Sequence, residues 1–116
     1  WILDDAFKFV AREVRRGRTY DAILLDPPSF GRGPKGELWK VEQQIGLLLK
    51  NIRRILEPKG GMVVLTMYNL EASSLMLKCL MEDYFPGGTL EYGELALQCS
   101  ASSRMLPLSL FARWEA

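Results

Sequence analysis

The chain has 116 residues, and 15 Lys and Arg against 14 Asp and Glu leave a formal net charge of +1. This length is typical of one domain, and 48% hydrophobic with 25% charged residues is the composition of an ordinary globular protein. The sequence excludes a collagen-like repeat, a disordered chain and a membrane span, because no apolar run approaches the roughly 18 residues that a bilayer crossing needs. The near-balance of charge also argues against a protein that wraps a polyanion.

The absence of histidine is the most informative feature of the composition. Without His the chain has no Ser-His-Asp triad, no Cys-His pair and no HExxH zinc site, and no bound metal is expected. Cys79 and Cys99 are far apart and form no CxxC pair, which indicates reduced core residues of a cytoplasmic protein. The chain opens with Trp1 rather than Met and shows no signal peptide, so we interpret its start as an internal cut.

The first segment predicts a helix followed by a buried strand. Residues 1–3 are an apolar stub, and Asp4 or Asp5 stands where an N-cap is expected, before a helix that Gly17 ends. The segment Tyr20–Asp26 contains four consecutive apolar residues, which is typical of a strand buried on both faces of a parallel sheet. Two prolines then end the strand, because proline cannot donate a ladder hydrogen bond.

The rest of the chain alternates loops, helices and strands. A glycine-rich loop over Gly31–Gly36 leads to a helix predicted at about Glu37–Leu56, whose apolar residues recur at helical spacing. A strand, a helix and a pair of strands are predicted at Met62–Met67, Glu71–Tyr84, Thr89–Gln98 and Leu106–Trp114. This order predicts one α/β domain, or part of one, with right-handed crossovers and an antiparallel strand pair at its end.

The strongest candidate site is Asp26-Pro27-Pro28-Ser29-Phe30, directly after the predicted buried strand. Open α/β sheets bind their ligands at the carboxyl ends of parallel strands. The Asp26 carboxylate and the Pro27 carbonyl would give two fixed acceptors for an amino group, and Phe30 could stack on a planar ring. The alternative is that these residues only end the strand, with the aspartate capping the turn.

Two short segments carry a resemblance to a known family. Asp-Pro-Pro-Ser-Phe after Tyr-Asp-Ala-Ile-Leu-Leu resembles motif IV of class I S-adenosylmethionine (SAM)-dependent methyltransferases, and Asp4-Asp5-Ala6-Phe7 resembles their motif III. The string DAILLDPPSFGRGPKGELWK, residues 21–40, is similar to bacterial methyltransferases related to the large-subunit ribosomal RNA enzymes. The resemblance covers essentially the whole chain. It implies a Rossmann-like class I methyltransferase sheet, mostly parallel with a terminal antiparallel strand pair, and SAM as the cofactor.

The resemblance also implies roles for individual residues. The motif III acid, Asp5 or else Asp4, would accept a hydrogen bond from the adenine amino group, and Asp26 would lie near the methionine end of SAM and the target atom. The implied catalytic residues are Asp26, Pro27 and Phe30; the implied cofactor-binding residues are Asp4, Asp5, Ala6, Phe7, Asp26 and Pro28; the implied substrate-binding residues are Ser29, Arg32 and Lys35.

The family pattern further implies that the chain is one part of a domain. The family's sheet has the strand order 3-2-1-4-5-7-6 and begins with a strand and a glycine-rich loop, neither of which occurs in this sequence. Residues 1–3 look like the end of the third strand, so residues 1–116 are expected to be a partial catalytic domain, truncated at its N-terminus, from motif III onward. Alone, such a piece is expected to be inactive and to bind SAM weakly or not at all.

Three further features have two interpretations each. The loop Gly31–Gly36 spells GxGxxG but does not lead directly from strand into helix, so we interpret it either as a substrate clamp, with Arg32 and Lys35 on phosphates, or as a solvated loop. Trp39 is expected to pack on the sheet or to shield the cleft. A basic cluster fits phosphate contacts or a helix C-terminus equally well, and it consists of Lys8, Arg12, Arg15, Arg16 and Arg18.

These features predict a SAM-dependent methyltransferase that acts on ribosomal RNA in the cytoplasm, with no membrane partner. The positions at which a C5-cytosine enzyme carries its nucleophilic Cys hold Ser29 and Met67-Tyr68-Asn69, which favours a substrate nitrogen as the methyl acceptor. The alternatives are a protein or small-molecule acceptor, and a non-catalytic RNA-binding or assembly module. The sequence leaves the target nucleotide and the oligomeric state open.

Overall fold

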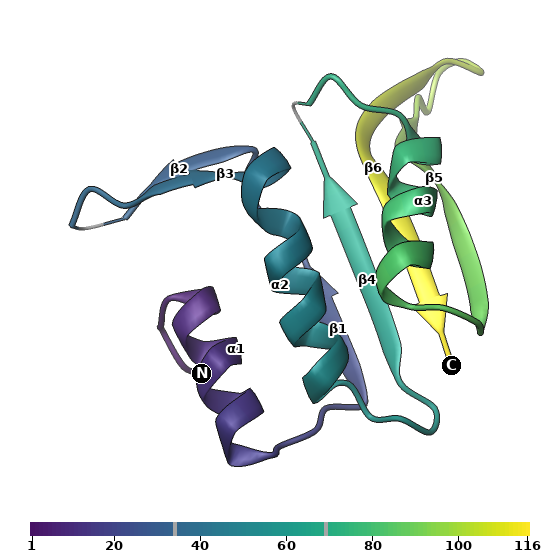
Figure 1. The fold of residues 1–116 in the computed structure, drawn as a ribbon. Helices are drawn as coiled ribbons and strands as arrows, with labels where there is room; N and C mark the ends of the chain where they lie inside the picture. The colour runs from purple at the N-terminus through teal and green to yellow at the C-terminus, as the bar shows by residue number, and fades with distance from the viewer. Residues whose placement is uncertain (34, 69) are drawn as a thin grey trace.

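The computed structural model describes residues 1–33, 35–68 and 70–116. In these ranges the chain forms three helices, a four-stranded sheet and a separate two-stranded hairpin (Figure 1). The helices are α1 (Ala6–Arg16), α2 (Val41–Ile55) and α3 (Ser74–Tyr84). The strands are β1 (Ala22–Leu25), β2 (Phe30–Arg32), β3 (Leu38–Lys40), β4 (Met62–Met67), β5 (Thr89–Gln98) and β6 (Met105–Glu115).

The larger sheet has the strand order β1-β4-β6-β5. β1 pairs parallel with β4, whereas β6 pairs antiparallel with both β4 and β5. In the family's numbering, β1, β4, β6 and β5 correspond to strands 4, 5, 7 and 6, so this sheet matches the last four strands of the predicted order. The predicted antiparallel pair at the end of the chain is confirmed. β1 lies at the edge of the sheet.

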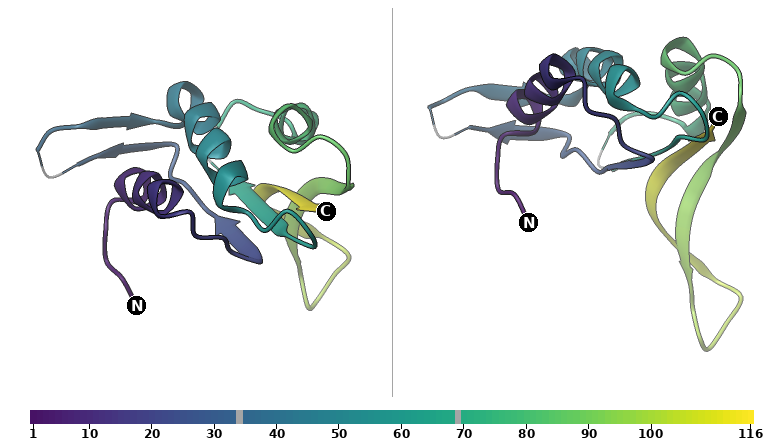
Figure 2. Two further views of the ribbon diagram at one scale, coloured as in Figure 1. Left: turned by 60° about the horizontal axis from the view of Figure 1, so that its bottom comes forward. Right: turned by 90° about the horizontal axis from the view of Figure 1, so that it is seen from below.

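The three helices all lie on the same side of this sheet, where α3 contacts β5 and β6 and α1 contacts α2 (Figure 2). Alternate residues of β4 are therefore buried beneath them, Val63 and Leu65 with no exposed surface, and Leu49 of α2 is equally buried. Residues that point to the opposite face, called here the uncovered face, are more exposed, and Leu24 is 74% exposed. The prediction that the first strand is buried on both faces is therefore wrong, because helices cover only one of them.

The first helix has the predicted ends. The Asp5 side chain accepts a hydrogen bond from the backbone N–H of Lys8 at 3.0 Å and so caps α1. Gly17 ends the helix in the left-handed conformation, with φ 63°, which glycine adopts without steric cost. The residues before Asp5 are neither helix nor strand and are exposed. In the family's strand order the third strand pairs only with the second, which is not among these residues, so the assignment of residues 1–3 to the end of a third strand stays a prediction.

The second predicted helix begins later than expected. Leu38–Lys40 forms β3 and pairs antiparallel with β2, so α2 starts only at Val41. The predicted loop Gly31–Gly36 is thus partly strand and partly the tip of a hairpin, and its Pro34 lies outside the described residues. α3 likewise begins at Ser74 instead of Glu71, because Ser73 is its N-cap.

The strands of the second half agree with the prediction. Met62–Met67 and Thr89–Gln98 are strands with the predicted bounds, and β6 extends one residue further at each end. Met67 of β4 pairs with Leu110, so the first residues of β6 and the last of β5 continue as a two-stranded arm beyond the rest of the sheet (Figure 2).

Both cysteines are exposed, so their predicted place in the core is wrong. α3 buries Leu77 and Met81, and Cys79 lies between them in sequence, about half a turn away around the helix axis. Cys99 follows the last residue of β5, at the end of the projecting arm. None of the helices in the described ranges has the length and hydropathy that a bilayer crossing requires.

Candidate functional site: a cleft beside the first strand

A cleft of about 590 Å³ lies between the start of α1, the carboxyl end of β1 and the β2–β3 hairpin. It joins two segments that are separate in the sequence. Its lining includes most of the residues predicted from the two motifs, namely Asp5, Ala6, Phe7, Asp26, Pro27 and Pro28. The remaining walls come from the hairpin and α2, chiefly Leu38, Trp39, Gln44 and Leu48.

The two acidic candidates before α1 lie in different surroundings. The Asp5 carboxylate caps α1 and also lines the cleft. Asp4 is not among the lining residues, and its Oδ2 accepts a hydrogen bond from the Arg12 guanidinium at 2.6 Å. That hydrogen bond lowers the pKa of Asp4 below its ordinary value. The geometry therefore favours Asp5 over Asp4 as a ligand-binding carboxylate.

The segment after β1 is held by hydrogen bonds at both ends. The Thr66 hydroxyl, from β4, donates to Oδ1 of Asp26 at 2.5 Å. The Trp39 indole N–H, from β3, donates to the carbonyl of Pro28 at 2.5 Å. Because proline also restricts the backbone φ angle, the Pro27 carbonyl between these contacts belongs to a stiff segment.

Trp39 also joins the hairpin to the first helix. Its ring centroid lies 5.4 Å from that of Phe7, with an angle of 58° between the ring planes. Trp39 thus forms part of the cleft wall and packs on Phe7 and Pro28, whereas packing on the sheet was the favoured expectation.

Besides Asp4, four predicted residues lie outside this cleft lining. Ser29 and Phe30 line a separate hollow of about 410 Å³ together with Lys40 and Glu42. Phe30 pairs with Lys40 and its neighbour Gly31 pairs with Trp39, so Phe30 and Trp39 point to opposite sides of the hairpin. The other two, Arg32 and Lys35, belong to β2 and the hairpin tip.

Ion pairs account for much of the basic cluster in the first helix. Glu13 is buried, with 1% of its surface exposed. It accepts hydrogen bonds from the Tyr20 hydroxyl at 2.6 Å and from Arg16 at 3.0 Å, and Arg18 lies 3.8 Å away. The Tyr20 hydrogen bond is the main reason that the pKa of Glu13 is lowered. These contacts, with the Arg12–Asp4 pair, favour the structural interpretation of the cluster over phosphate contacts.

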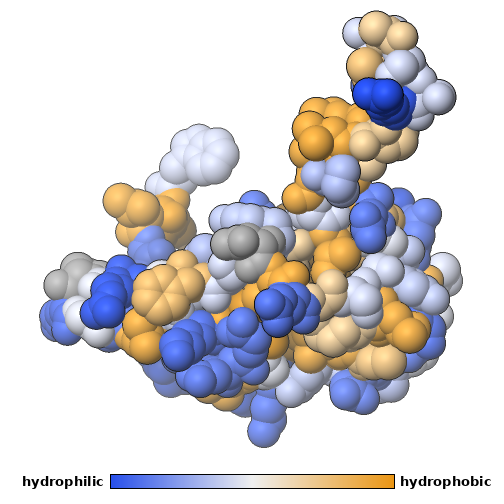
Figure 3. Space-filling model, turned by 90° about the horizontal axis from the view of Figure 1, so that it is seen from above, coloured by the Kyte–Doolittle hydropathy of each residue, from blue (hydrophilic) through white to orange (hydrophobic). Residues whose placement is uncertain are grey.

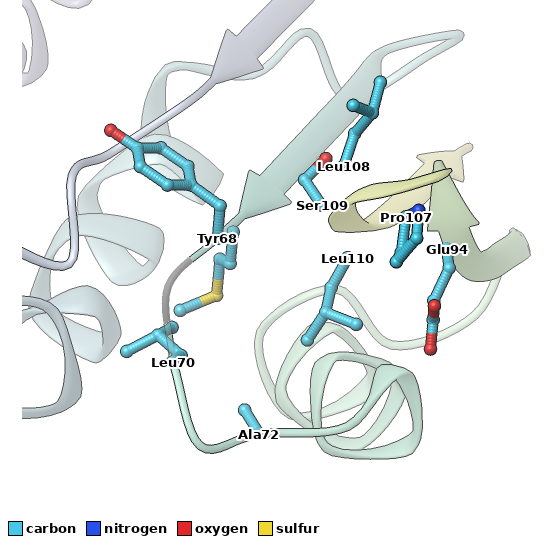
Figure 4. A pocket seen from close by; sticks show the side chains of 9 residues that line it. Tyr68, Leu70, Ala72, Glu94, Pro107, Leu108, Ser109 and Leu110 are labelled. Carbon is cyan, nitrogen blue, oxygen red and sulfur yellow. The ribbon is translucent and has the colours of Figure 1, made fainter. Parts of the chain in front are cut away.

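The projecting arm is apolar over most of its length. Figure 3 shows hydrophobic side chains along it, and those that are at least 40% exposed include Leu95, Leu97, Met105, Leu106 and Leu108. At its base a pocket of about 160 Å³ lies at the carboxyl end of β4, between Met67, Tyr68, Leu70, Glu94 and Leu110 (Figure 4).

Several solved structures that are similar to this chain are methyltransferases. A SAM-dependent methyltransferase from Agrobacterium tumefaciens is 44% identical, with a TM-score of 0.89 over 99% of this chain. A candidate methyltransferase complexed with SAH, at 22% identity and TM-score 0.69, and a candidate SAM-dependent methyltransferase from Streptococcus mutans, at 20% and 0.65, each match over 98% of the chain. No protein-family model and no curated protein sequence matches.

The comparisons confirm the predicted fold class, the α/β Rossmann-like fold of SAM-dependent methyltransferases. At 20–22% identity the other two similarities concern the fold alone. The chain spans 39% of the length of the Agrobacterium protein and 30% of each of the other two.

Proposed function

We propose that residues 1–116 form part of the catalytic domain of a SAM-dependent methyltransferase whose acceptor is ribosomal RNA. One observation carries this proposal: the Asp26–Pro28 segment and the Asp5–Phe7 segment line the same cleft. The 44% identity to a SAM-dependent methyltransferase supports it. The A. tumefaciens protein is longer, which supports the proposal that further parts of the domain complete the site.

The residues of the cleft fit SAM chemically. A volume of about 590 Å³ is within the usual range for small-molecule sites. Asp5 offers a carboxylate to the adenine amino group, and Phe7 and Ala6 offer apolar surface beside it. Asp26 offers a second carboxylate at the other motif, where the cationic methionine end would lie.

The reaction needs an acceptor that is aligned and freed of water. When bound, SAM supplies a methyl group on a positively charged sulfur, which leaves as a neutral thioether. Asp26 and the Pro27 carbonyl accept hydrogen bonds from the acceptor's amino group and orient its lone pair, so that alignment supplies much of the rate. The methylated nitrogen then releases its extra proton to solvent, with the Asp26 carboxylate beside it as an acceptor. Trp39 and Leu38 exclude water from one side of the cleft. Phe30 is 51% exposed on the other side of the hairpin, in the second hollow, where it can stack on a base next to the acceptor.

An RNA acceptor is supported by the residues on this side of the molecule. Lys8 lines the cleft, and Arg32 and Lys35 lie on the adjoining hairpin, where cations can contact phosphates. Ser29 and Met67-Tyr68 provide no thiol for attack on cytosine, and Asn69 lies outside the described residues. We therefore propose a nitrogen acceptor, and a ribosomal RNA substrate implies a cytoplasmic reaction.

The substitution Asp26→Ala in the full-length protein tests this function. We expect methyl transfer from tritiated SAM to unmodified large-subunit ribosomal RNA to fall on the order of 100-fold, because the acceptor loses its orientation. The melting temperature should not change, because Asp26 is exposed. Asp21→Ala, which removes a carboxylate before the other end of β1, is the matched control and should keep full activity.

Other outcomes distinguish the alternatives. Wild-type turnover by the Asp26→Ala variant would contradict the assignment. If tritium from SAM is found in protein or in a small molecule and none is found in RNA, the result would support a protein or small-molecule acceptor instead. RNA binding without any transfer by the wild-type protein would support a non-catalytic module.

A further inference from the structure

The hydroxyl of Thr66 donates a hydrogen bond to the carboxylate of Asp26. β1 and β4 run parallel, and Leu25 is aligned with Leu65. The next residue along each strand is Asp26 and Thr66, so parallel pairing sets these two side chains beside each other. They are 40 positions apart in the sequence, and the Thr66 Oγ1 to Asp26 Oδ1 distance is 2.5 Å.

The hydroxyl has one proton and two acceptors within reach. The carbonyl of Leu25 lies 3.4 Å from the Thr66 Oγ1, whereas the Asp26 carboxylate is nearer by almost 1 Å. A hydrogen bond to an ionised oxygen is also stronger than one to a neutral carbonyl. The proton therefore goes to Asp26, and this contact restricts the rotation of an exposed carboxylate that would otherwise sample several rotamers.

Thr66 lies on the uncovered face, in a strand whose alternate residues are buried beneath the helices. A valine of nearly the same shape would suit this strand at least as well, because Val has high strand propensity. The contribution that distinguishes threonine here is the hydrogen bond to Asp26.

We propose that Thr66 is a positioning residue for methyl transfer. It holds Oδ1 of Asp26, and so presents the second carboxylate oxygen to the acceptor's amino group. This inference rests on the proposed function, since it assigns to Thr66 the orientation of a group that the reaction uses. Thr66 itself contacts neither the acceptor nor the cofactor.

The test compares Thr66→Val with Thr66→Ser in the full-length protein. Thr66→Val removes the donor and should lower kcat for methyl transfer about 10-fold, as expected for the loss of a charge-assisted hydrogen bond that fixes a reacting geometry. The KM for SAM and the calorimetric Kd for SAH should change less than kcat, and the melting temperature should stay near its wild-type value. Thr66→Ser keeps the donor and should restore most of the rate. Thr89→Val, at the start of β5 and the far end of the sheet, controls for the loss of a strand hydroxyl.

Two further measurements separate positioning from a general structural effect. Crystal structures of the Thr66 variants should show a changed or disordered Asp26 side chain in Thr66→Val only. In an Asp26→Ala background, Thr66→Val should have no further effect on the rate, because the two residues act through one contact.

The results that overturn this inference differ from those that overturn the proposed function. Wild-type kcat in Thr66→Val together with an inactive Asp26→Ala would overturn the role of Thr66 and leave the proposed function standing. An equal loss of rate and melting temperature in both Thr66 variants would also overturn it. An active Asp26→Ala would overturn both.

Discussion

The two faces of the larger sheet differ although the same strands form both. On β4, Val63, Leu65 and Met67 are buried beneath the helices and belong to the core. Val64 and Thr66 alternate with them and point to the uncovered face, where Thr66 binds Asp26. One strand of six residues thus stabilises the fold with one set of side chains and orients a candidate functional group with the other.

The largest expected effect concerns the covered face. Leu65→Ala should lower the free energy of unfolding by about 2–5 kcal/mol, because a fully buried leucine leaves a cavity when truncated. Urea unfolding followed by circular dichroism measures it. Val64→Ala, at the next position of the same strand, should cost clearly less. Equal losses at the two positions would contradict the difference between the faces.

A second effect concerns the buried carboxylate in the helix layer. Folding lowers the pKa of Glu13, chiefly through the Tyr20 hydrogen bond, so ionised Glu13 contributes stability above the unfolded pKa of about 4.5. That contribution is lost as the pH falls through the lower folded pKa. Glu13→Gln should therefore destabilise the protein near pH 7 and make little difference at the lowest pH.

Unfolding midpoints measured from pH 7 downward test this expectation. Glu82→Gln is the control, since Glu82 is 52% exposed in its pair with Lys78 and should change the profile little. A pH profile of Glu13→Gln that runs parallel to the wild-type profile would show that Glu13 is not the group responsible.

The smallest expected effect belongs to the uncovered face. In the 116-residue chain, Leu24→Ser should change the free energy of unfolding by less than about 0.5 kcal/mol, because Leu24 is 74% exposed. In the full-length protein we expect a cost of at least about 1 kcal/mol, since the proposed remainder of the domain would cover this face. The same small effect in both proteins would contradict the proposed domain organisation.

Local signals predicted much of the fold. The cap at Asp5 and the stop at Gly17 depend on contacts within a few residues, and both are confirmed. β4 and β5 have the predicted bounds, because an apolar run identifies β4 and alternating residues identify β5, each between turn residues. The sequence missed β3, since Leu38 continues the helical spacing of the residues after it and only the pairing with β2 removes it from the helix.

The candidate site was predictable in its residues but not in its geometry. The motif segments around Asp5 and Asp26 were identified from sequence, and the structure sets both in one cleft. Phe30 was grouped with Asp26 because they are close in sequence, but the alternation of the hairpin turns it to another hollow. Thr66 carries no motif signal, so only its strand register could have identified it.

The sequence by itself determined the three helices, the four strands of the larger sheet, the ends of α1 and the fold class, because these follow from hydrophobic periodicity, capping residues and motifs that act over short distances. Tertiary structure alone decided which side of each strand is covered, where Trp39 packs and which group holds Asp26. Those features depend on the register between segments, and the Thr66–Asp26 contact joins residues 40 positions apart. A hydrogen bond of that kind exists only after two strands have paired, which no local pattern specifies.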